Sequence, residues 1–125
     1  MPTPSEIVRA YLDAMEKRDI DTAQAFLADC FTMRFPGTPP MTALSELIAW
    51  AAPRYRFVSK TYDGYDTVGG EGGTAVVYCR GTLSGEWPDG TAFSGIRFID
   101  RFELSGAKIT RQDVWNDLAE TKAKE

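Results

Sequence analysis

The order of its sequence patterns is the feature that most constrains how this chain folds. Apolar residues recur at helical spacing in the first half of the chain. In the second half, apolar and polar residues alternate and predict strands at about 56–67, 75–87, 93–104 and 108–116. Helices followed by neighbouring antiparallel strands predict an α+β fold, in which a twisted, curved sheet wraps around the leading helices.

A helix that begins near residue 4 is the best-defined element of the first half. Thr3 is a good N-cap, Pro4 suits the first helical position and Glu6 completes a capping box. The apolar residues that follow share one face of this helix: Ile7, Val8, Tyr11, Leu12 and Met15. We expect that face to lie across the concave side of the sheet.

Three further elements are predicted before the long strands. Asp19 or Asp21 can cap a second, short helix that reaches Leu27. Residues 31–35 alternate as a short strand, which a Pro-Gly pair ends. A third helix is expected with Thr42 as its cap.

Length and charge narrow the class of protein. The 125 residues suit one domain, expected at 1–118, followed by a charged, frayed tail at 119–125. The net charge is −4 and no cluster of lysine and arginine precedes the tail, which predicts no nucleic-acid partner. No stretch approaches the roughly 20 apolar residues of a membrane span. The first ten residues lack the layout of a signal peptide, so we expect a cytoplasmic protein without a membrane partner.

The chain contains no histidine, which excludes Ser-His-Asp and Cys-His catalysis and every histidine-based metal site. Proton transfer would therefore use carboxylates, tyrosine, lysine or water. Cys30 and Cys79 form no CxxC pattern, so we expect two reduced core thiols, no metal and no cofactor. The glycine-rich segment 69–73 contains no lysine and joins two strands, so we interpret it as a flexible hairpin rather than a phosphate site.

Asp100 interrupts the apolar face of the third long strand. The other residues of that face are Ile96, Phe98, Phe102 and Leu104. A carboxylate between two inward phenylalanines is costly unless it is partnered or protonated. Burial favours the protonated form, which can donate a hydrogen bond. The alternative is that Asp100 pairs with a backbone N–H or an arginine and braces the sheet.

Further polar residues are expected near this aspartate. Tyr11 lies on the apolar face of the first helix, where it is either a core tyrosine or a hydrogen-bond donor to the site. On the last strand, either Gln112, Val114 and Asn116 point inward or Trp115 and its alternate neighbours do. We favour the first set, because charged residues are less costly outside.

Two stretches of the chain resemble the nuclear transport factor 2-like superfamily: TPSEIVRAYLDAMEKRDIDTAQAFLADCFTMRFPG and IDRFELSGAKITRQDVWND. This superfamily includes ketosteroid isomerases, limonene-epoxide hydrolases and SnoaL-like polyketide cyclases. The resemblance spans nearly the whole chain. It implies a cystatin-like fold, a cone-shaped α+β barrel with a curved antiparallel sheet around the leading helices, and a homodimer formed through the outer face of the sheet.

The resemblance matches the chemistry of these families only in part. Against the ketosteroid isomerases, Tyr11 falls on the oxyanion-hole tyrosine and Asp100 on the protonated aspartic acid, but Phe35 replaces the general base. The limonene-epoxide hydrolases have an arginine where Phe98 stands and a second aspartate near Val114. The SnoaL-like cyclases commonly use a histidine, which this chain lacks.

Residues and resemblance together predict a protein that binds a small hydrophobic molecule. It is either an isomerase- or cyclase-type enzyme, in which Tyr11 and Asp100 polarise a substrate oxygen, or a non-catalytic ligand-binding or dimerisation module of the same fold. The residues expected to line the pocket are Met15, Phe35, Leu47, Trp50, Phe98, Phe102, Gln112, Val114 and Asn116.

Overall fold

The strands follow the helices and form one sheet. The computed structural model describes residues 2–69 and 72–123. Its elements in chain order are α1 (Pro4–Glu16), α2 (Ile20–Gln24), β1 (Leu27–Arg34), α3 (Leu44–Ala51), β2 (Phe57–Gly69), β3 (Thr74–Glu86), β4 (Ala92–Ser105), β5 (Lys108–Asn116) and α4 (Leu118–Ala123). Among these residues the strand order is β1-β5-β4-β3-β2, so the sheet is open, with β1 and β2 at its edges. The predicted α+β class is confirmed.

The pairing of the strands matches the prediction except at one edge. The strands β2 to β5 form antiparallel pairs with one another, but β1 pairs in parallel with β5. β1 also begins earlier than the predicted strand at 31–35, because Leu27 pairs with Ile109 and the Ile109 N–H donates to the Phe26 carbonyl oxygen (2.8 Å). The predicted second helix correspondingly ends at Gln24, before Leu27.

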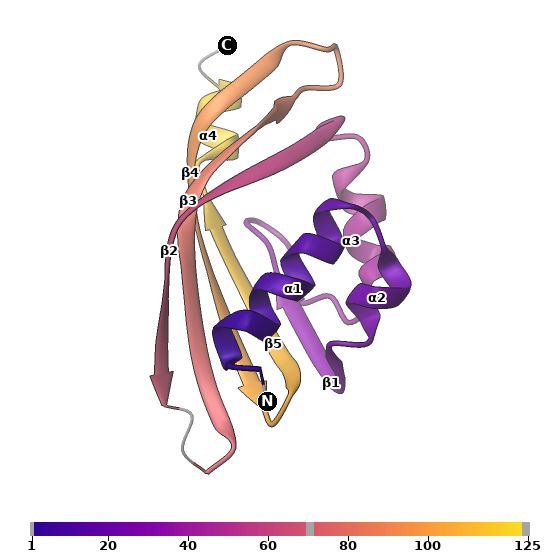
Figure 1. The fold of residues 1–125 in the computed structure, drawn as a ribbon. Helices are drawn as coiled ribbons and strands as arrows, with labels where there is room; N and C mark the ends of the chain where they lie inside the picture. The colour runs from indigo at the N-terminus through magenta and orange to yellow at the C-terminus, as the bar shows by residue number, and fades with distance from the viewer. Residues whose placement is uncertain (1, 70–71, 124–125) are drawn as a thin grey trace.

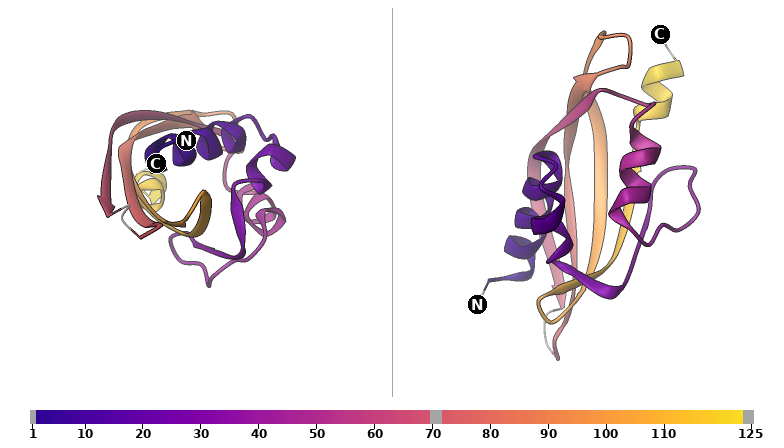
Figure 2. Two further views of the ribbon diagram at one scale, coloured as in Figure 1. Left: turned by 60° about the horizontal axis from the view of Figure 1, so that its bottom comes forward. Right: turned by 90° about the vertical axis from the view of Figure 1, so that its right-hand side faces the viewer.

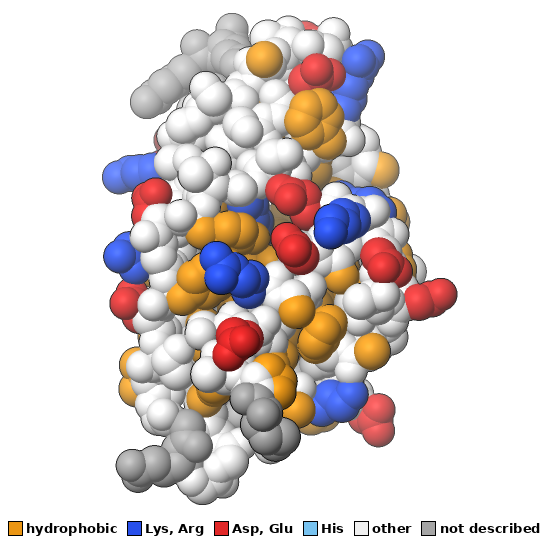
Figure 3. Space-filling view, viewed as in Figure 1, with side chains coloured by type: hydrophobic (Ala, Val, Ile, Leu, Met, Phe, Trp, Pro, Cys, Tyr) orange, Lys and Arg blue, Asp and Glu red, His pale blue; other side chains and the backbone are white. Residues whose placement is uncertain are grey.

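The sheet curves around α1. Figure 1 shows α1 across the concave side of the sheet, with α2 and α3 beside β1. Figure 2 shows the long strands curling around α1, as expected for a twisted sheet. α4 lies at the end of the sheet where β3 turns into β4. Acidic and basic side chains are interspersed on the face seen in Figure 3.

The cap predicted for α1 is present. The Glu6 N–H donates to Thr3 Oγ1 (3.2 Å) and the Thr3 N–H donates to Glu6 Oε1 (3.1 Å), which completes the capping box. Asp19 caps α2, because its carboxylate accepts from the Thr22 backbone N–H at 3.4 Å, and it also accepts from the Thr22 hydroxyl at 2.7 Å. The apolar face of α1 is buried as predicted.

Two segments differ from their predicted structure. α3 has Ala43 rather than Thr42 at its N-cap, since Glu46 Oε1 reaches back to the N–H groups of both residues (3.1 and 3.2 Å). The expected tail forms most of α4, because Leu118 is buried and the Thr121 N–H donates to the Asp117 carbonyl oxygen (2.9 Å). Part of the predicted hairpin at 69–73 lies outside the described residues.

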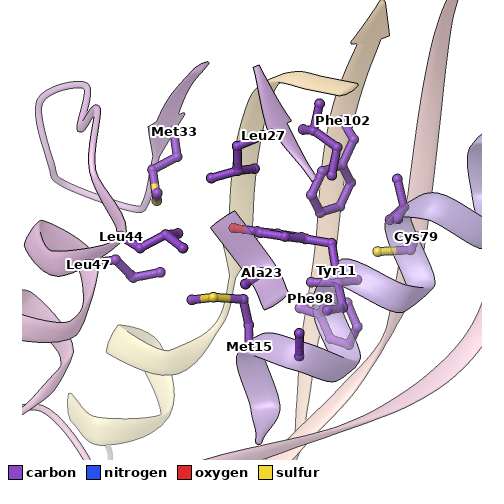
Figure 4. Packing of buried hydrophobic residues seen from close by; sticks show 14 of the residues in the cluster. Tyr11, Met15, Ala23, Leu27, Met33, Leu44, Leu47, Cys79, Phe98 and Phe102 are labelled. Carbon is purple, nitrogen blue, oxygen red and sulfur yellow. The ribbon is translucent and has the colours of Figure 1, made fainter. Parts of the chain in front are cut away.

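Tyr11 lies at the centre of the hydrophobic core, between the inner face of the sheet and the helices (Figure 4). Its ring meets Phe102 edge-on, with 6.1 Å between centroids. Cys79 is buried, as predicted, but Cys30 is exposed, because it lies on the outward side of β1, so the prediction of two core thiols was wrong for Cys30. Both cysteines are free.

Candidate functional site

Two small interior spaces lie between the helices and the concave face of the sheet. We call the space of about 90 Å³ the Tyr11 lobe and the space of about 50 Å³ the Asp100 lobe, after residues that line them. Four residues line both lobes: Phe35, Tyr55, Val58 and Lys60. The two lobes are therefore adjacent parts of one interior site.

Most residues predicted to line a pocket are found around these lobes. The Tyr11 lobe is bordered by Met15, Phe35, Leu47 and Gln112. The Asp100 lobe is bordered by Phe35, Trp50, Phe98, Val114 and Asn116. Phe102 lines neither lobe, because its ring is fully buried against Tyr11. On β5, Gln112 and Val114 are buried and Trp115 is exposed, as predicted. Asp113, a charged residue of the set expected to point outward, is buried as well.

Asp100 points inward, as predicted, and its side chain has no exposed surface. One carboxylate oxygen, Oδ2, accepts a hydrogen bond from Lys60 Nζ at 2.8 Å. The other oxygen, Oδ1, is buried and has no hydrogen-bond partner among the described residues. Asp100 therefore has one oxygen held by a cation and one oxygen without a partner, beside a lobe lined mostly by apolar and aromatic residues.

Lys60 is the functional residue that the sequence analysis missed. It lies on β2, and its ammonium group is 4.8 Å from the centroid of the Phe98 ring. Its backbone N–H donates to Glu16 Oε1 at 2.9 Å, which joins β2 to the end of α1. The alternation of residues on β2 could have indicated it. Val58, Lys60 and Tyr62 share the half-buried face of this strand, and Lys60 is the charged residue among them.

This partner changes the interpretation of Asp100. The sequence left two possibilities open, a neutral acid and a residue paired with a backbone N–H or an arginine; the structure gives Asp100 a cationic partner, and this partner is a lysine at 2.8 Å. Burial alone would lower the pKa of Lys60; the charge of Asp100 and the hydrogen bond to it outweigh burial, so the pKa of Lys60 is raised. Lys60 therefore remains cationic at neutral pH and is unsuited to forming a Schiff base, which needs the neutral amine.

Tyr11 is 1% exposed, and its hydroxyl donates to Gln112 Oε1 at 3.3 Å. Burial, and then the negative charge of Asp100, raise the pKa of Tyr11, so the phenol stays protonated as a hydrogen-bond donor. In Figure 4 the hydroxyl points away from Cys79, towards Leu27 and Leu44. No hydrogen bond joins Tyr11 to Asp100 within the described part of the chain, and the two residues line different lobes.

Two neighbouring residues, Cys79 and Phe35, are uncharged at neutral pH. Burial raises the pKa of the Cys79 thiol to about 12, so this side chain stays a thiol beside Asp100. Phe35 packs against Trp50 with 5.3 Å between ring centroids. Its ring forms part of the wall between the two lobes.

Two larger hollows open to the surface. One, of about 670 Å³, lies between the segment 34–38 and the strands β4 and β5, and its lining includes Ile99 and Trp115 together with the inner-face residues Phe98 and Val114. The other, of about 460 Å³, lies between the end of α3, the turn after β3 and α4. Neither contains Lys60 or Asp100. The volume of a hollow therefore does not by itself indicate where Lys60 and Asp100 lie.

Residues 2–69 and 72–123 contain no group of three or more cysteines and carboxylates arranged to hold a metal ion. No helix in the described ranges is long and apolar enough to cross a membrane.

Comparisons with known proteins agree on the fold. A family model described as a SnoaL-like domain matches residues 8–112. An NTF2-like protein of unknown function from Burkholderia pseudomallei is 18% identical, with 98% of this chain and 97% of that chain covered and a TM-score of 0.80. A putative polyketide cyclase from Xanthomonas campestris is 20% identical, with 95% and 93% covered and a TM-score of 0.75.

A third solved structure is that of TerC co-crystallised with polyporic acid. It is 15% identical to this chain, covers 94% of each chain and has a TM-score of 0.75. A search of curated proteins found no match. At these identities the structural matches establish a shared fold, which many different activities use.

Proposed function

The chain belongs to the family of SnoaL-like domains, and from this we propose that it binds a small, mainly apolar carbonyl compound and removes a proton from the carbon beside the carbonyl group. The observation that carries the proposal is the arrangement of Asp100. Its Oδ2 is held by Lys60 at 2.8 Å, and its Oδ1 is buried without a partner among the described residues. An unsatisfied acceptor in an apolar cavity is costly, so a bound molecule that supplies a proton there is stabilising.

The two members of the pair suit the two halves of an enolisation. Asp100 Oδ1 accepts the proton from the carbon, and the C–H electron pair forms the carbon–carbon double bond of the enolate. The carbonyl electrons move to the oxygen, where the Lys60 ammonium group stabilises the negative charge. In a substrate with a β,γ carbon–carbon double bond the enolate is a dienolate, and returning the proton to its γ carbon gives the conjugated ketone, which is an isomerisation. Attack of the enolate carbon on a second carbonyl group of the same molecule gives a cyclisation, with the proton passing to the new alkoxide.

Tyr11 and Gln112 provide a second polar contact, in the Tyr11 lobe. Because the phenol donates to Gln112, a ligand oxygen in this lobe would accept from Tyr11 in place of the amide oxygen. The catalytic role expected for Tyr11 thus becomes one of binding a remote oxygen, while Lys60 takes over polarisation of the reacting carbonyl. Two solved relatives are consistent with ligands of this kind, one called a putative polyketide cyclase and one co-crystallised with polyporic acid.

Hydrogen exchange tests the proposed chemistry. The purified protein is incubated with the enolisable ketone 2-tetralone in D₂O, and NMR follows the loss of the protons beside the carbonyl. We expect exchange faster than in buffer, reduced roughly 10²- to 10⁴-fold in Asp100→Asn, the range of a lost general base. Lys60→Met should also lose exchange, whereas Lys60→Arg should retain part of it.

Asp66→Asn is the matched control, because Asp66 also forms an ion pair, with Arg80 at 2.8 Å, but lies on the exposed surface. Its exchange rate should equal that of the parent. Binding of 2-tetralone without accelerated exchange in the parent would contradict the enzymatic part of the proposal. The alternative of a non-catalytic ligand-binding module would then be correct.

A further inference from the structure

The hollow of about 460 Å³ is built from three separate segments at one end of the molecule. Its walls come from the end of α3, the turn between β3 and β4, and α4, which lie near one another at the top of the right-hand view in Figure 2. The residues that line it are Pro53, Arg54, Tyr55, Trp87, Pro88, Leu118, Ala119 and Lys122. We call it the α4 hollow. Its walls combine flat apolar surfaces with two cationic side chains.

Both cationic side chains of the α4 hollow form cation–π contacts with tryptophan rings. The Arg54 guanidinium carbon lies 4.3 Å from the Trp50 ring centroid, and Lys122 Nζ lies 4.7 Å from the Trp87 ring centroid. Within the described ranges neither forms an ion pair with a carboxylate; the pairs that do form involve other residues. Asp89, in the adjacent turn, accepts from the Thr91 backbone N–H at 2.9 Å. The hollow is therefore locally positive in a chain of net charge −4.

A residue in the wall of the α4 hollow also has an unsatisfied hydrogen-bond donor. Trp87 is 3% exposed, and its indole N–H has no partner among the described residues. A buried donor without an acceptor is destabilising, and an acceptor on a ligand would remove that cost. Two free cations and one free donor beside apolar walls favour a ligand that presents negatively charged oxygens on an aromatic or alicyclic body.

The α4 hollow adjoins the Asp100 lobe. Tyr55 and Leu118 line both spaces. The interior lobes hold only about 90 Å³ and 50 Å³, whereas even a cavity that binds benzene measures about 150 Å³ and ligand sites usually reach about 300–1,000 Å³. A molecule whose carbonyl group reaches Lys60 therefore needs additional room. The hollow of about 670 Å³ also adjoins the Asp100 lobe, but its lining includes the carboxylates of Asp113 and Asp117. The lining of the α4 hollow has two cationic side chains and no carboxylate, so it is the adjacent space that suits an anion.

We propose that the α4 hollow binds the carboxylate end of an aromatic or polycyclic carboxylic acid, whose body extends past Tyr55 and Leu118 towards Lys60. Arg54 and Lys122 attract the carboxylate, and the Trp87 indole N–H donates to one of its oxygens. The inference names the class of ligand for the interior site and in that respect rests on the proposed function. The anion site itself depends only on the α4 hollow.

Paired probes of equal shape test the anion site. Binding of 2-naphthoate and of neutral 2-naphthamide to the full chain is measured by calorimetry at low ionic strength. We expect naphthoate to bind roughly tenfold more tightly, as one charge-assisted hydrogen bond provides. The Arg54→Gln/Lys122→Gln double variant should lose this preference, and added salt should weaken it in the parent. Both changes are on the surface, so folding is preserved.

The matched control is Arg9→Gln, because the Arg9 guanidinium also lies over an aromatic ring, 5.6 Å from the Tyr65 centroid, but outside the α4 hollow. It should keep the preference for naphthoate. An equal affinity for both probes in the parent, or an unchanged preference in the double variant, overturns the inference. Ketone exchange is measured separately, so naphthoate selectivity without exchange contradicts only the proposed reaction.

Discussion

At the scale of single residues, the Lys60–Asp100 pair makes an asymmetric prediction about stability. Lys60→Met leaves a carboxylate with no exposed surface and no partner, which should lower the free energy of unfolding by about 3–5 kcal/mol. Asp100→Asn should cost less, about 1–3 kcal/mol, because the Lys60 side chain is 22% exposed and its ammonium group can reach water. The double variant should cost less than the sum of the two. Urea denaturation of the four proteins measures this coupling.

The exposed Arg80–Asp66 pair provides the control cycle. Its side chains are 50% and 68% exposed, so its coupling should lie between about 0 and 1 kcal/mol. The Lys60–Asp100 coupling should persist well into alkaline solution, because the pKa of Lys60 is raised in the folded state. The stabilisation is complete below the pKa of Lys60 in the unfolded chain, and it is lost only as the pH rises through the pKa in the folded protein. If Asp100→Asn is as stable as the parent, the ion pair with Lys60 does not stabilise the fold.

At the scale of elements, the close approach of β2 to β3 is what brings Lys60 to Asp100. A Cβ atom on Gly81 would lie 1.9 Å from the Thr61 carbonyl oxygen, next to Lys60 in the chain. Gly81→Ala should therefore push β2 away from β3, lower stability by about 1–3 kcal/mol and abolish ketone exchange. Chemical denaturation and the exchange assay measure the two effects.

Gly64→Ala is the control for this change. Its added Cβ would meet the guanidinium of Arg80, 3.0 Å away, and that flexible side chain can move aside. Both variants replace a glycine of the β2–β3 pair, so they differ chiefly in what the new methyl group contacts. Equal losses of stability in the two variants would show that glycine is needed for reasons other than this close approach.

The same elements explain how far the sequence alone predicts this site. Alternation on β4 was enough to place Asp100 inward between Phe98 and Phe102, because strand periodicity is local. The pairing with Lys60 depends on how strongly β2 curls over β3, which is set by the register around Gly81 and not by the pattern of either strand. The sequence did not predict α4, because this helix depends on the burial of Leu118, which is a tertiary contact. The charged residues that follow Leu118 instead indicated an exposed tail.

Family resemblance had a similar limit. It pointed correctly to the SnoaL-like fold and to Tyr11 and Asp100 as residues of the interior. It also suggested that the two act on one oxygen, but their partners in this chain are Gln112 and Lys60. Proteins that share a fold differ in the side chains around equivalent positions. The hydrogen-bond partners of Tyr11 and Asp100 could therefore be identified only from the three-dimensional structure.

At the scale of the whole molecule, the outer face of the sheet predicts a homodimer. Ile99 and Trp115 are neighbours across β4 and β5 and are 37% and 52% exposed. The Arg97–Asp117 ion pair lies beside them, so an apolar centre is bordered by charged residues, as in many protein interfaces. The same patch on two copies can meet around a two-fold axis. Light scattering at micromolar concentration should therefore give twice the 13.9 kDa mass of one chain.

A lysine at the centre of this patch should separate the copies, because each charge would be buried without a partner. Trp115→Lys should therefore shift the mass to that of one chain while the circular dichroism spectrum stays that of the parent. Phe57→Lys is the matched control: Phe57 is 48% exposed on the edge strand β2, outside the patch, and this variant should remain dimeric. Dissociation by Phe57→Lys but not by Trp115→Lys would place the interface at the β2 edge, where strands of two copies can pair. A parent with the mass of one chain would contradict dimerisation altogether.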